Sequence, residues 1–137
     1  TVTALDSENA SLSITDAITV EITDSAMTSK GTIAADETWT GEHKLTGDLI
    51  VPADTTLTID ANARITLEKF DWDAGGTDTQ RVELIVHGSL VMLDSEDLDG
   101  NALRPKIGVE NAAGSWHGII IKEGGSAEIR AEIANAN

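Results

Sequence analysis

The feature that most constrains this chain is a hydrophobic triplet that recurs at an interval of 35 residues. The triplets are Leu49-Ile50-Val51, Leu84-Ile85-Val86 and Ile119-Ile120-Ile121. A fixed interval of this size indicates one supersecondary unit that is repeated and stacked, so that each unit buries the face that its neighbour leaves open. The chain is therefore expected to fold as a stack of coils.

Two further short runs follow each triplet and have apolar residues at their outer positions. The second runs are Leu57-Thr58-Ile59, Leu90-Val91-Met92 and Ala127-Glu128-Ile129. The third runs are Ile65-Thr66-Leu67, Ile107-Gly108-Val109 and the incomplete Glu132-Ile133-Ala134. This alternation is the period-2 signal of a strand with one buried face. Each coil is thus predicted to contain three short strands joined by bends, and each strand to pair with its equivalent one coil later, as in a parallel β-helix.

The segments 47–59, 83–90 and 115–121 resemble successive coils of right-handed β-helix proteins of the pectin-lyase-like class. The resemblance covers about residues 38 to 137, and it implies an all-β fold, a right-handed parallel β-helix of about three coils. Proteins of this class are common extracellular and cell-surface modules of bacteria, so the resemblance implies that location here. Lyases, hydrolases, adhesins and structural proteins all use this coil pattern, so the resemblance selects no single activity.

The N-terminal part of the chain lies outside this repeat. Five of its apolar residues occupy even positions, with polar residues between most of them: Leu12, Ile14, Ile18, Val20 and Ile22. This pattern predicts a long amphipathic strand, or two halves bent at residues 16–17. We expect residues 1–33 to form an N-terminal β segment that covers, caps or pairs with something, and residues 34–137 to form the β-helix.

The first strand of each coil has apolar residues on both faces. Its outer positions point into the core, which leaves Ile50, Ile85 and Ile120 stacked on the other side. Strands that read as continuous hydrophobic runs are usually covered on both faces. We expect residues 11–23 to cover this isoleucine ladder; the alternative is a partner subunit, and in either case the ladder is a predicted cover or assembly face.

Two polar, turn-rich insertions, 70–80 and 94–104, interrupt the coils and are expected to project from one corner, where a binding function would sit. Trp72, in the first insertion, is the candidate for contact with a glycan. The second insertion contains Asp97-Leu98-Asp99-Gly100-Asn101, which matches part of a calcium loop. The full EF-hand frame places Ser95 and Lys106 where Asp and Glu are required, so an EF-hand is excluded. A looser calcium site remains the alternative to a solvated acidic loop, and no other cofactor is expected.

No catalytic constellation emerges from the outward-facing positions. Glycan cleavage requires two carboxylates held several ångströms apart, or a calcium cluster with a basic residue. The stacked outward positions are Thr58, Val91 and Glu128 in the second sheet and Thr66, Gly108 and Glu132 in the third. Each sheet thus contributes one carboxylate, and no catalytic residue is assigned. The three histidines have no metal-binding spacing and are interpreted as surface turn residues.

The composition excludes several classes of partner. The 24 acidic and 9 basic residues give a formal charge of −15, which argues against binding to nucleic acid or to an anionic membrane. There is no cysteine, and no apolar stretch is long enough to insert into a membrane. The chain begins without methionine, which is consistent with a processed protein or a fragment.

The predicted function is that of a non-enzymatic extracellular structural or surface protein, a short β-helix that stacks on copies of itself or on further coils of a longer chain. The incomplete third strand at Glu132 leaves an open strand edge, and such edges template pairing with another chain. We therefore expect a homo-oligomer or polymer, with head-to-tail stacking into a filament or surface assembly. The alternative is a carbohydrate-binding or polysaccharide-degrading module with a polysaccharide as partner.

Overall fold

The computed structural model describes residues 27–71, 73–109 and 114–137. Within these ranges the regular structure consists of short strands without a helix. The strands form three four-stranded parallel sheets and one two-stranded antiparallel sheet. The fold is all-β and is a parallel β-helix, as the repeat predicted.

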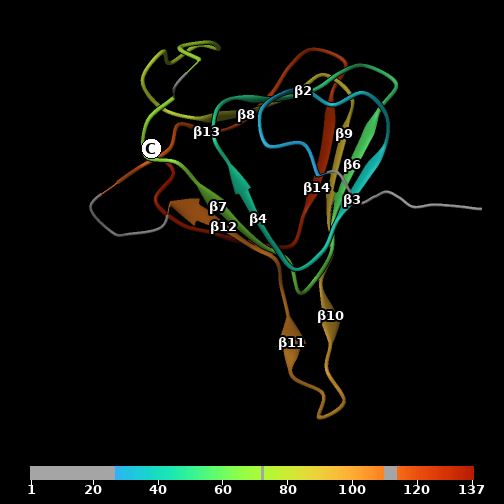
Figure 1. Cartoon of the computed structure of the whole chain (residues 1–137). Helices are drawn as coiled ribbons and strands as arrows, with labels where there is room; N and C mark the ends of the chain where they lie inside the picture. The colour runs from blue at the N-terminus through green and yellow to red at the C-terminus, as the bar shows by residue number, and fades with distance from the viewer. Residues whose placement is uncertain (1–26, 72, 110–113) are drawn as a thin grey trace, which may run out of the picture.

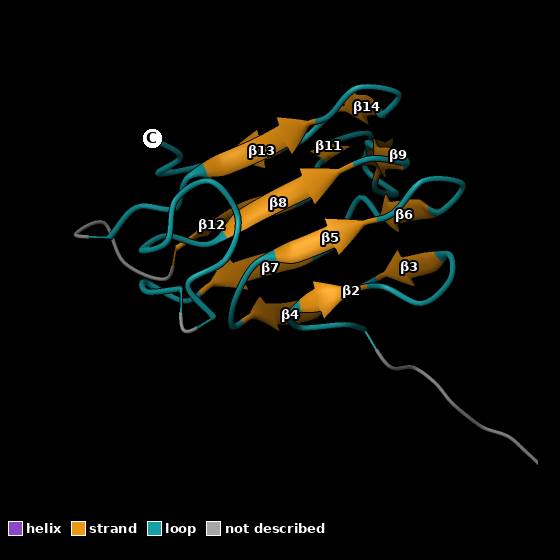
Figure 2. Cartoon of the chain, turned by 90° about the horizontal axis from the view of Figure 1, so that it is seen from above, coloured by secondary structure: helices purple, strands orange, loops and turns teal. Residues whose placement is uncertain are grey.

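The chain visits the three parallel sheets in turn, and each circuit of three strands makes one coil (Figure 1). The first sheet contains β2 (Gly31–Thr32), β5 (Leu49–Val51), β8 (Glu83–Val86) and β13 (Gly118–Ile121). The second contains β3 (Glu37–Trp39), β6 (Thr56–Ile59), β9 (Ser89–Met92) and β14 (Ser126–Ile129). The third contains β4 (Glu42–Leu45), β7 (Arg64–Leu67), β12 (Lys106–Val109) and β15 (Glu132–Ile133). Figure 2 shows the successive coils stacked along one axis.

The strand register confirms that triplet residues 35 positions apart in the sequence lie beside each other in adjacent coils. Ile50 pairs with Ile85, and Ile85 pairs with Ile120. The outer residues of the triplets align in the same way, since Leu49 pairs with Leu84. Equivalent residues therefore stack directly on one another, because parallel strands with equal register carry each side chain onto the same face.

The described residues contain four coils, whereas the triplets indicated about three. The additional coil is the first one, formed by β2, β3 and β4. It lacks a hydrophobic triplet because β2 is a two-residue strand, Gly31–Thr32, which pairs with β5 through its backbone. The coil pairing thus begins three residues before the expected start at residue 34. The amphipathic segment with Leu12, Ile14, Ile18, Val20 and Ile22 lies outside the described residues.

A continuous apolar core runs inside the coils. It is built from the outer positions of the predicted strand runs, which are at most 2% exposed: Leu49, Val51, Leu57, Ile59, Ile65, Leu67, Leu84, Val86, Leu90, Met92 and Ile107. Trp39 and Trp116 are also completely buried. Each such side chain is worth roughly 1.5–3 kcal/mol when it leaves water, so this column is the main source of stability.

The isoleucine ladder faces away from this core. Ile85 is buried, with 6% of its surface exposed, while Ile50 and Ile120 are half-buried. The cover that we assigned to residues 11–23 lies outside the described residues, so the alternatives of an intramolecular cover and a partner subunit both stay predictions.

The two insertions leave the stack at different corners, so the prediction of a single corner is wrong. Residues 70–80 connect the third sheet to the first, whereas residues 94–104 connect the second sheet to the third. The second insertion is an antiparallel hairpin of β10 (Ser95–Glu96) and β11 (Ala102–Leu103), which projects from the stack in Figure 1. Its turn contains Asp99-Gly100, a strong hairpin signal that we had assigned to a polar loop.

Candidate functional site

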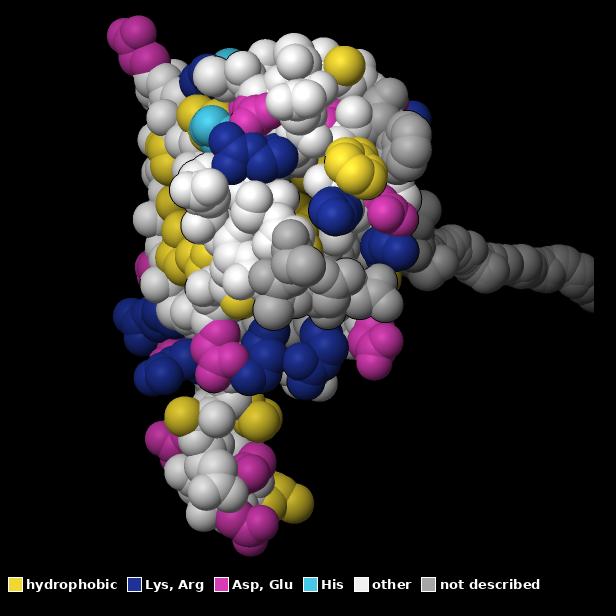
Figure 3. Space-filling view, turned by 90° about the vertical axis from the view of Figure 1, so that its left-hand side faces the viewer, with side chains coloured by type: hydrophobic (Ala, Val, Ile, Leu, Met, Phe, Trp, Pro, Cys, Tyr) yellow, Lys and Arg dark blue, Asp and Glu magenta, His cyan; other side chains and the backbone are white. Residues whose placement is uncertain are grey.

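The C-terminal end of the stack exposes side chains that the earlier coils bury. Ile121, Ile129 and Ile133 are 42%, 39% and 43% exposed. Their register partners one coil earlier are at most 2% exposed: Val86, Met92 and Ile107. Hydrophobic side chains accordingly line the left-hand edge of the molecule in Figure 3, where the last coil lies. At this end of the stack the core positions are therefore exposed to solvent.

The backbone of the last coil is also open. Strands β13, β14 and β15 are the outermost members of their sheets, and no further described strand pairs with their outer edges. Beyond them, an isolated parallel bridge joins Trp116 to Ala136. Free N–H and C=O groups beside an exposed apolar surface are what a strand from another coil requires.

The N-terminal end of the stack is closed by side chains. Trp39 is fully buried there, and its ring lies 4.5 Å from the ring of His43 between centroids. Glu37 accepts hydrogen bonds from the Trp39 indole N–H (2.7 Å) and from the backbone N–H of Thr28 (3.0 Å). His43 Nε2 lies 2.9 Å from the Thr28 carbonyl oxygen, so this histidine belongs to a packed cluster and is not a surface turn residue. The N-terminal end of the stack thus buries its core side chains, whereas the C-terminal end exposes them.

The insertion of residues 70–80 carries a second candidate site. It folds back on itself because the Asp71 carboxylate accepts the backbone N–H groups of Asp73 (3.0 Å) and Gly75 (2.8 Å). Lys30 anchors it from outside through an ion pair of 2.9 Å with Asp73. Asp71 is itself buried, with 7% exposure. The loop is therefore held by its own carboxylates.

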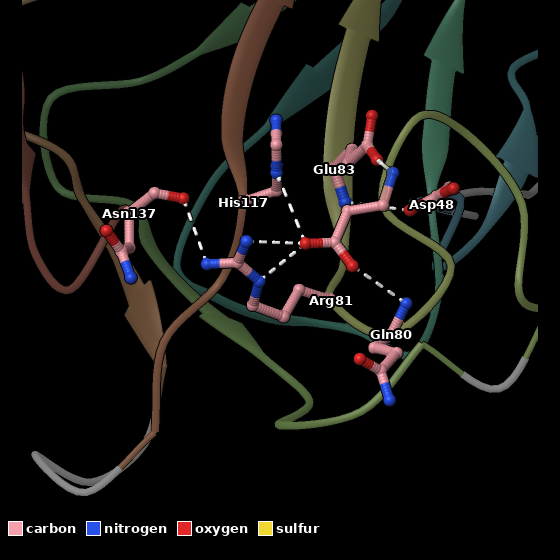
Figure 4. Close-up of polar contacts among 7 residues, drawn as sticks. Asp48, Gln80, Arg81, Glu83, His117 and Asn137 are labelled. Carbon is pink, nitrogen blue, oxygen red and sulfur yellow. Dashed lines mark hydrogen bonds and ion pairs between the residues drawn. The ribbon is translucent and has the colours of Figure 1, made fainter.

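Asp78, at the end of this loop, ties the loop to the last coil. Its Oδ2 atom lies 2.5 Å from an Arg81 nitrogen and 3.4 Å from His117 Nδ1; Figure 4 labels Arg81 and His117 and marks these contacts with dashed lines. Arg81 also donates to the carbonyl oxygen of Asn137 at 3.0 Å. The backbone N–H of Gln80 and the Arg81 guanidinium hold the pKa of Asp78 below its usual value. His117, predicted as a surface turn residue, is half-buried beside this carboxylate.

Asp48 and Glu83 form a pair of buried carboxyl groups under the loop. They are 6% and 0% exposed. Asp48 Oδ1 accepts the backbone N–H of Glu83 at 2.7 Å, and Glu83 accepts the backbone N–H of Asp78 through Oε2. The other oxygen of each group, Asp48 Oδ2 and Glu83 Oε1, is buried without a hydrogen-bond partner. Burial, together with the charges of Asp71, Glu83 and Asp73, raises the pKa of Asp48 to about 6.

This pair was not predicted from the sequence, although the sequence contains a signal for it. Asp48 and Glu83 each precede a triplet and are separated by the same 35-residue interval. The register Leu49 to Leu84 therefore stacks the two carboxyl groups in adjacent coils. The repeat could have predicted their contact if the residues flanking each triplet had been aligned as well.

The acidic hairpin turn that we considered for calcium is organised by Asp97. Asp97 Oδ1 accepts the backbone N–H groups of Asp99 and Asn101, both at 2.9 Å. The Asn101 side chain donates to Asp97 as well, and this contact is the main reason that the pKa of Asp97 is lowered. Across the described ranges, no group of three or more His, Asp or Glu side chains is placed to hold one metal ion.

We expect calcium and a chelator to leave the thermal unfolding curve of the protein unchanged, because these donors already occupy the Asp97 carboxylate. The Asp97→Ala variant should show faster amide exchange at Asp99 and Asn101, because their N–H groups lose the carboxylate that accepts them. Calorimetry with and without calcium checks the first point, and exchange measured by NMR checks the second. A calcium-dependent rise in melting temperature that Asp97→Ala abolishes would instead establish a calcium site in this turn.

The outward faces differ from the expected register at one position. Thr58, Val91 and Glu128 stack as predicted. Glu132, however, pairs with Lys106 and not with Gly108, so that prediction is wrong by two residues along the strand. The reason is that the apolar positions align, so that Ile133 lies beside Ile107 in the core column and Glu132, one residue earlier, lies beside Lys106. Glu132 forms an ion pair with Lys106.

Trp72, the predicted glycan contact, lies outside the described residues, so its role stays a prediction. Comparison with known proteins found no matching family model, no matching curated protein and no matching solved structure. Nor does any helix in the described part of the chain have the length and apolar character needed to cross a membrane. The candidate sites are therefore interpreted from their geometry alone.

Proposed function

We propose that this chain is a structural β-helix module of the pectin-lyase-like kind, acting outside the cell or on its surface, which self-associates through its C-terminal end. The single observation that carries the proposal is the exposure of Ile121, Ile129 and Ile133 at inward-facing core positions. Exposed apolar patches of this kind on a soluble protein mark interaction surfaces.

The chemistry of the partner follows from the interior of the molecule. Each coil before the last is covered by the next coil, whose strands pair in parallel and whose inward residues continue the same core column. A further coil with apolar inward positions therefore fits the open end. We assign that coil to the first coil of a second copy of this chain. Its strands β2, β3 and β4 are outermost in their sheets, so a head-to-tail arrangement continues the parallel pairing and can extend into a filament.

Electrostatics should oppose this assembly at low ionic strength. The chain has a formal charge of −15, so copies repel one another over a distance set by the Debye length, which is about 10 Å at 0.1 M salt. Salt should therefore promote association. The buried contact itself is apolar and is little affected by screening.

We expect light scattering coupled to size-exclusion chromatography to show species that grow with protein and salt concentration. Electron microscopy should show filaments if the arrangement is head-to-tail. Ile129→Lys should abolish association, because it places a charge among the inward positions of the open coil. Circular dichroism establishes that the variant keeps its strands.

Leu98→Lys provides a matched control. Leu98 is a fully exposed apolar side chain at the hairpin turn, far along the chain from the inward positions, and its exchange adds the same charge. It should associate like the unchanged protein. A monomer at every salt and protein concentration, or normal association of Ile129→Lys, would contradict the proposed function.

A further inference from the structure

The N-terminal end of the core is crossed by a short segment that belongs to none of the three sheets. This segment, residues 27–30, is named the strap. The backbone N–H and the hydroxyl of Thr28 donate to Glu37 in the second sheet, and the Thr28 carbonyl oxygen lies 2.9 Å from His43 in the third. The chain then enters the first sheet at Gly31. In Figure 1 the strap is the blue stretch that precedes β2, inside the ring of strands.

The strap occupies part of the place of a preceding coil. Where one described coil follows another, the N–H group after a third-sheet strand donates to the coil before it, as Glu68 donates to the Leu45 carbonyl oxygen at 2.9 Å. Thr46 is the equivalent residue one coil earlier, since Leu45 pairs with Leu67. Its N–H donates to the Ser29 carbonyl oxygen, also at 2.9 Å. The strap thus supplies a backbone acceptor that a preceding coil would otherwise supply.

The surface beneath the strap is apolar and matches the open end of the stack. Ile33, Trp39 and Leu45 belong to the core of the first coil and are at most 1% exposed. The column of core residues that begins with Trp39 ends, in the last coil, with the exposed Ile129. The end of the core that is exposed in one copy is therefore complementary to the end that is covered in the next copy.

The strap covers this surface mainly with polar groups. Met27 is its one apolar residue, and it packs against the core while only half-buried. Lys30 ties the strap to Asp73 through an exposed ion pair of 2.9 Å, and exposed ion pairs contribute little to stability. The last coil of another copy offers strand pairing and apolar side chains together, so it competes with the strap for the same surface.

We propose that the strap is displaceable and that it hides a docking surface, formed by Ile33, Trp39 and Leu45, for the last coil of a second copy. The inference rests on the proposed head-to-tail association and deepens it, because it assigns the step that controls association. A protein whose binding-competent state is only partly populated binds with an affinity reduced by that fraction. A closed strap therefore weakens association, and a looser strap strengthens it.

Loosening the strap without changing the core tests this inference. In Thr28→Val/Lys30→Ala, the strap loses its hydroxyl bond to the second sheet and its outer ion pair. Light scattering of the full chain should then show association at a roughly 3- to 10-fold lower protein concentration, the effect of about one net hydrogen bond on the population of the closed strap. Thr58→Val/Lys122→Ala makes the same chemical changes away from the strap and should associate like the unchanged protein.

Amide exchange in a non-associating background measures the opening of the strap itself. Ile129→Lys is expected to keep the copies apart, so exchange in this variant reports motions within one chain. Adding the loosening substitutions should speed exchange of the Thr46 N–H, which donates to the strap. The N–H of Leu93 donates to Ile59 at 3.1 Å between two inner coils, and its exchange should stay slow.

The two measurements separate the strap from the proposed function. The inference is overturned if the loosened variant associates no more readily than its control. It is also overturned if Thr46 exchanges only as fast as Leu93, because the strap then opens only when the whole fold does. In both cases the unchanged protein still associates, so the proposed function stands. If no chain associates at any protein or salt concentration, the proposed function fails, and the inference that rests on it fails as well.

Discussion

Replacing Gly88 with alanine is expected to destabilise the protein by at least about 3 kcal/mol, enough to unfold a marginally stable domain. Gly88 lies at the corner between β8 and β9, and a Cβ atom there would come well within 3.0 Å of the carbonyl oxygens of Pro52 and Thr55. Both carbonyls are held in place, since Thr55 donates to Pro52 (3.2 Å) and Ser89 donates to Thr55 (2.9 Å). Both contacts are with backbone atoms, so no flexible side chain can move aside to relieve them. Urea denaturation measures the loss.

Gly114→Ala is the control for this substitution. Its Cβ atom would lie 3.4 Å from the nearest atom, a methyl group of Val109, which is an ordinary contact. We expect a change below about 1 kcal/mol, because the added methyl mainly restricts the unfolded chain. Equal urea midpoints for the two variants would contradict the close contact between residue 88 and the carbonyl oxygens of Pro52 and Thr55 in the preceding coil.

Replacing Trp39 with alanine should cost about 3–5 kcal/mol, because it removes the largest side chain from the closed end of the core. Trp39 is fully buried, lies against His43 and donates its indole N–H to Glu37 at 2.7 Å. The cavity would open the core column at its N-terminal end. Urea denaturation with fluorescence of the remaining tryptophans measures the effect.

Trp39→Phe separates packing from hydrogen bonding at this position. Phenylalanine retains much of the apolar volume but loses the donor to Glu37, so we expect a cost of about 1–2 kcal/mol. If the alanine and phenylalanine variants unfold at the same urea concentration, Trp39 does not seal this end of the core.

The positions of the strands and the identity of the core could be read from the sequence. Alternation over three or four residues identifies a strand and its buried face, and both are local properties of the chain. Leu57, Leu90 and Ile107 are buried as the alternation predicted. The constant interval predicted the stacking, because parallel strands in register repeat the same face at the same spacing.

Other features depend on backbone geometry that side-chain patterns do not record. The first coil pairs through β2, Gly31–Thr32, which offers backbone groups without an apolar triplet. The corner at which an insertion leaves the stack depends on which two strands it connects, and the polar composition of 70–80 and 94–104 carries no information on that point.

The candidate sites were decided by contacts between residues far apart in the chain. The repeat aligned Asp48 with Glu83, but their burial depends on the loop that folds over them through Asp71 and Asp78. Likewise, the sequence predicted an open final strand, whereas the closed end at Trp39 required the meeting of β3, β4 and residue 28. The repeat, the strands and the core can be predicted from the order of the amino acids, because they follow from short-range alternation. Which polar groups are buried together and which end of the core is open depend on the folded arrangement, because desolvation depends on every group that surrounds an atom.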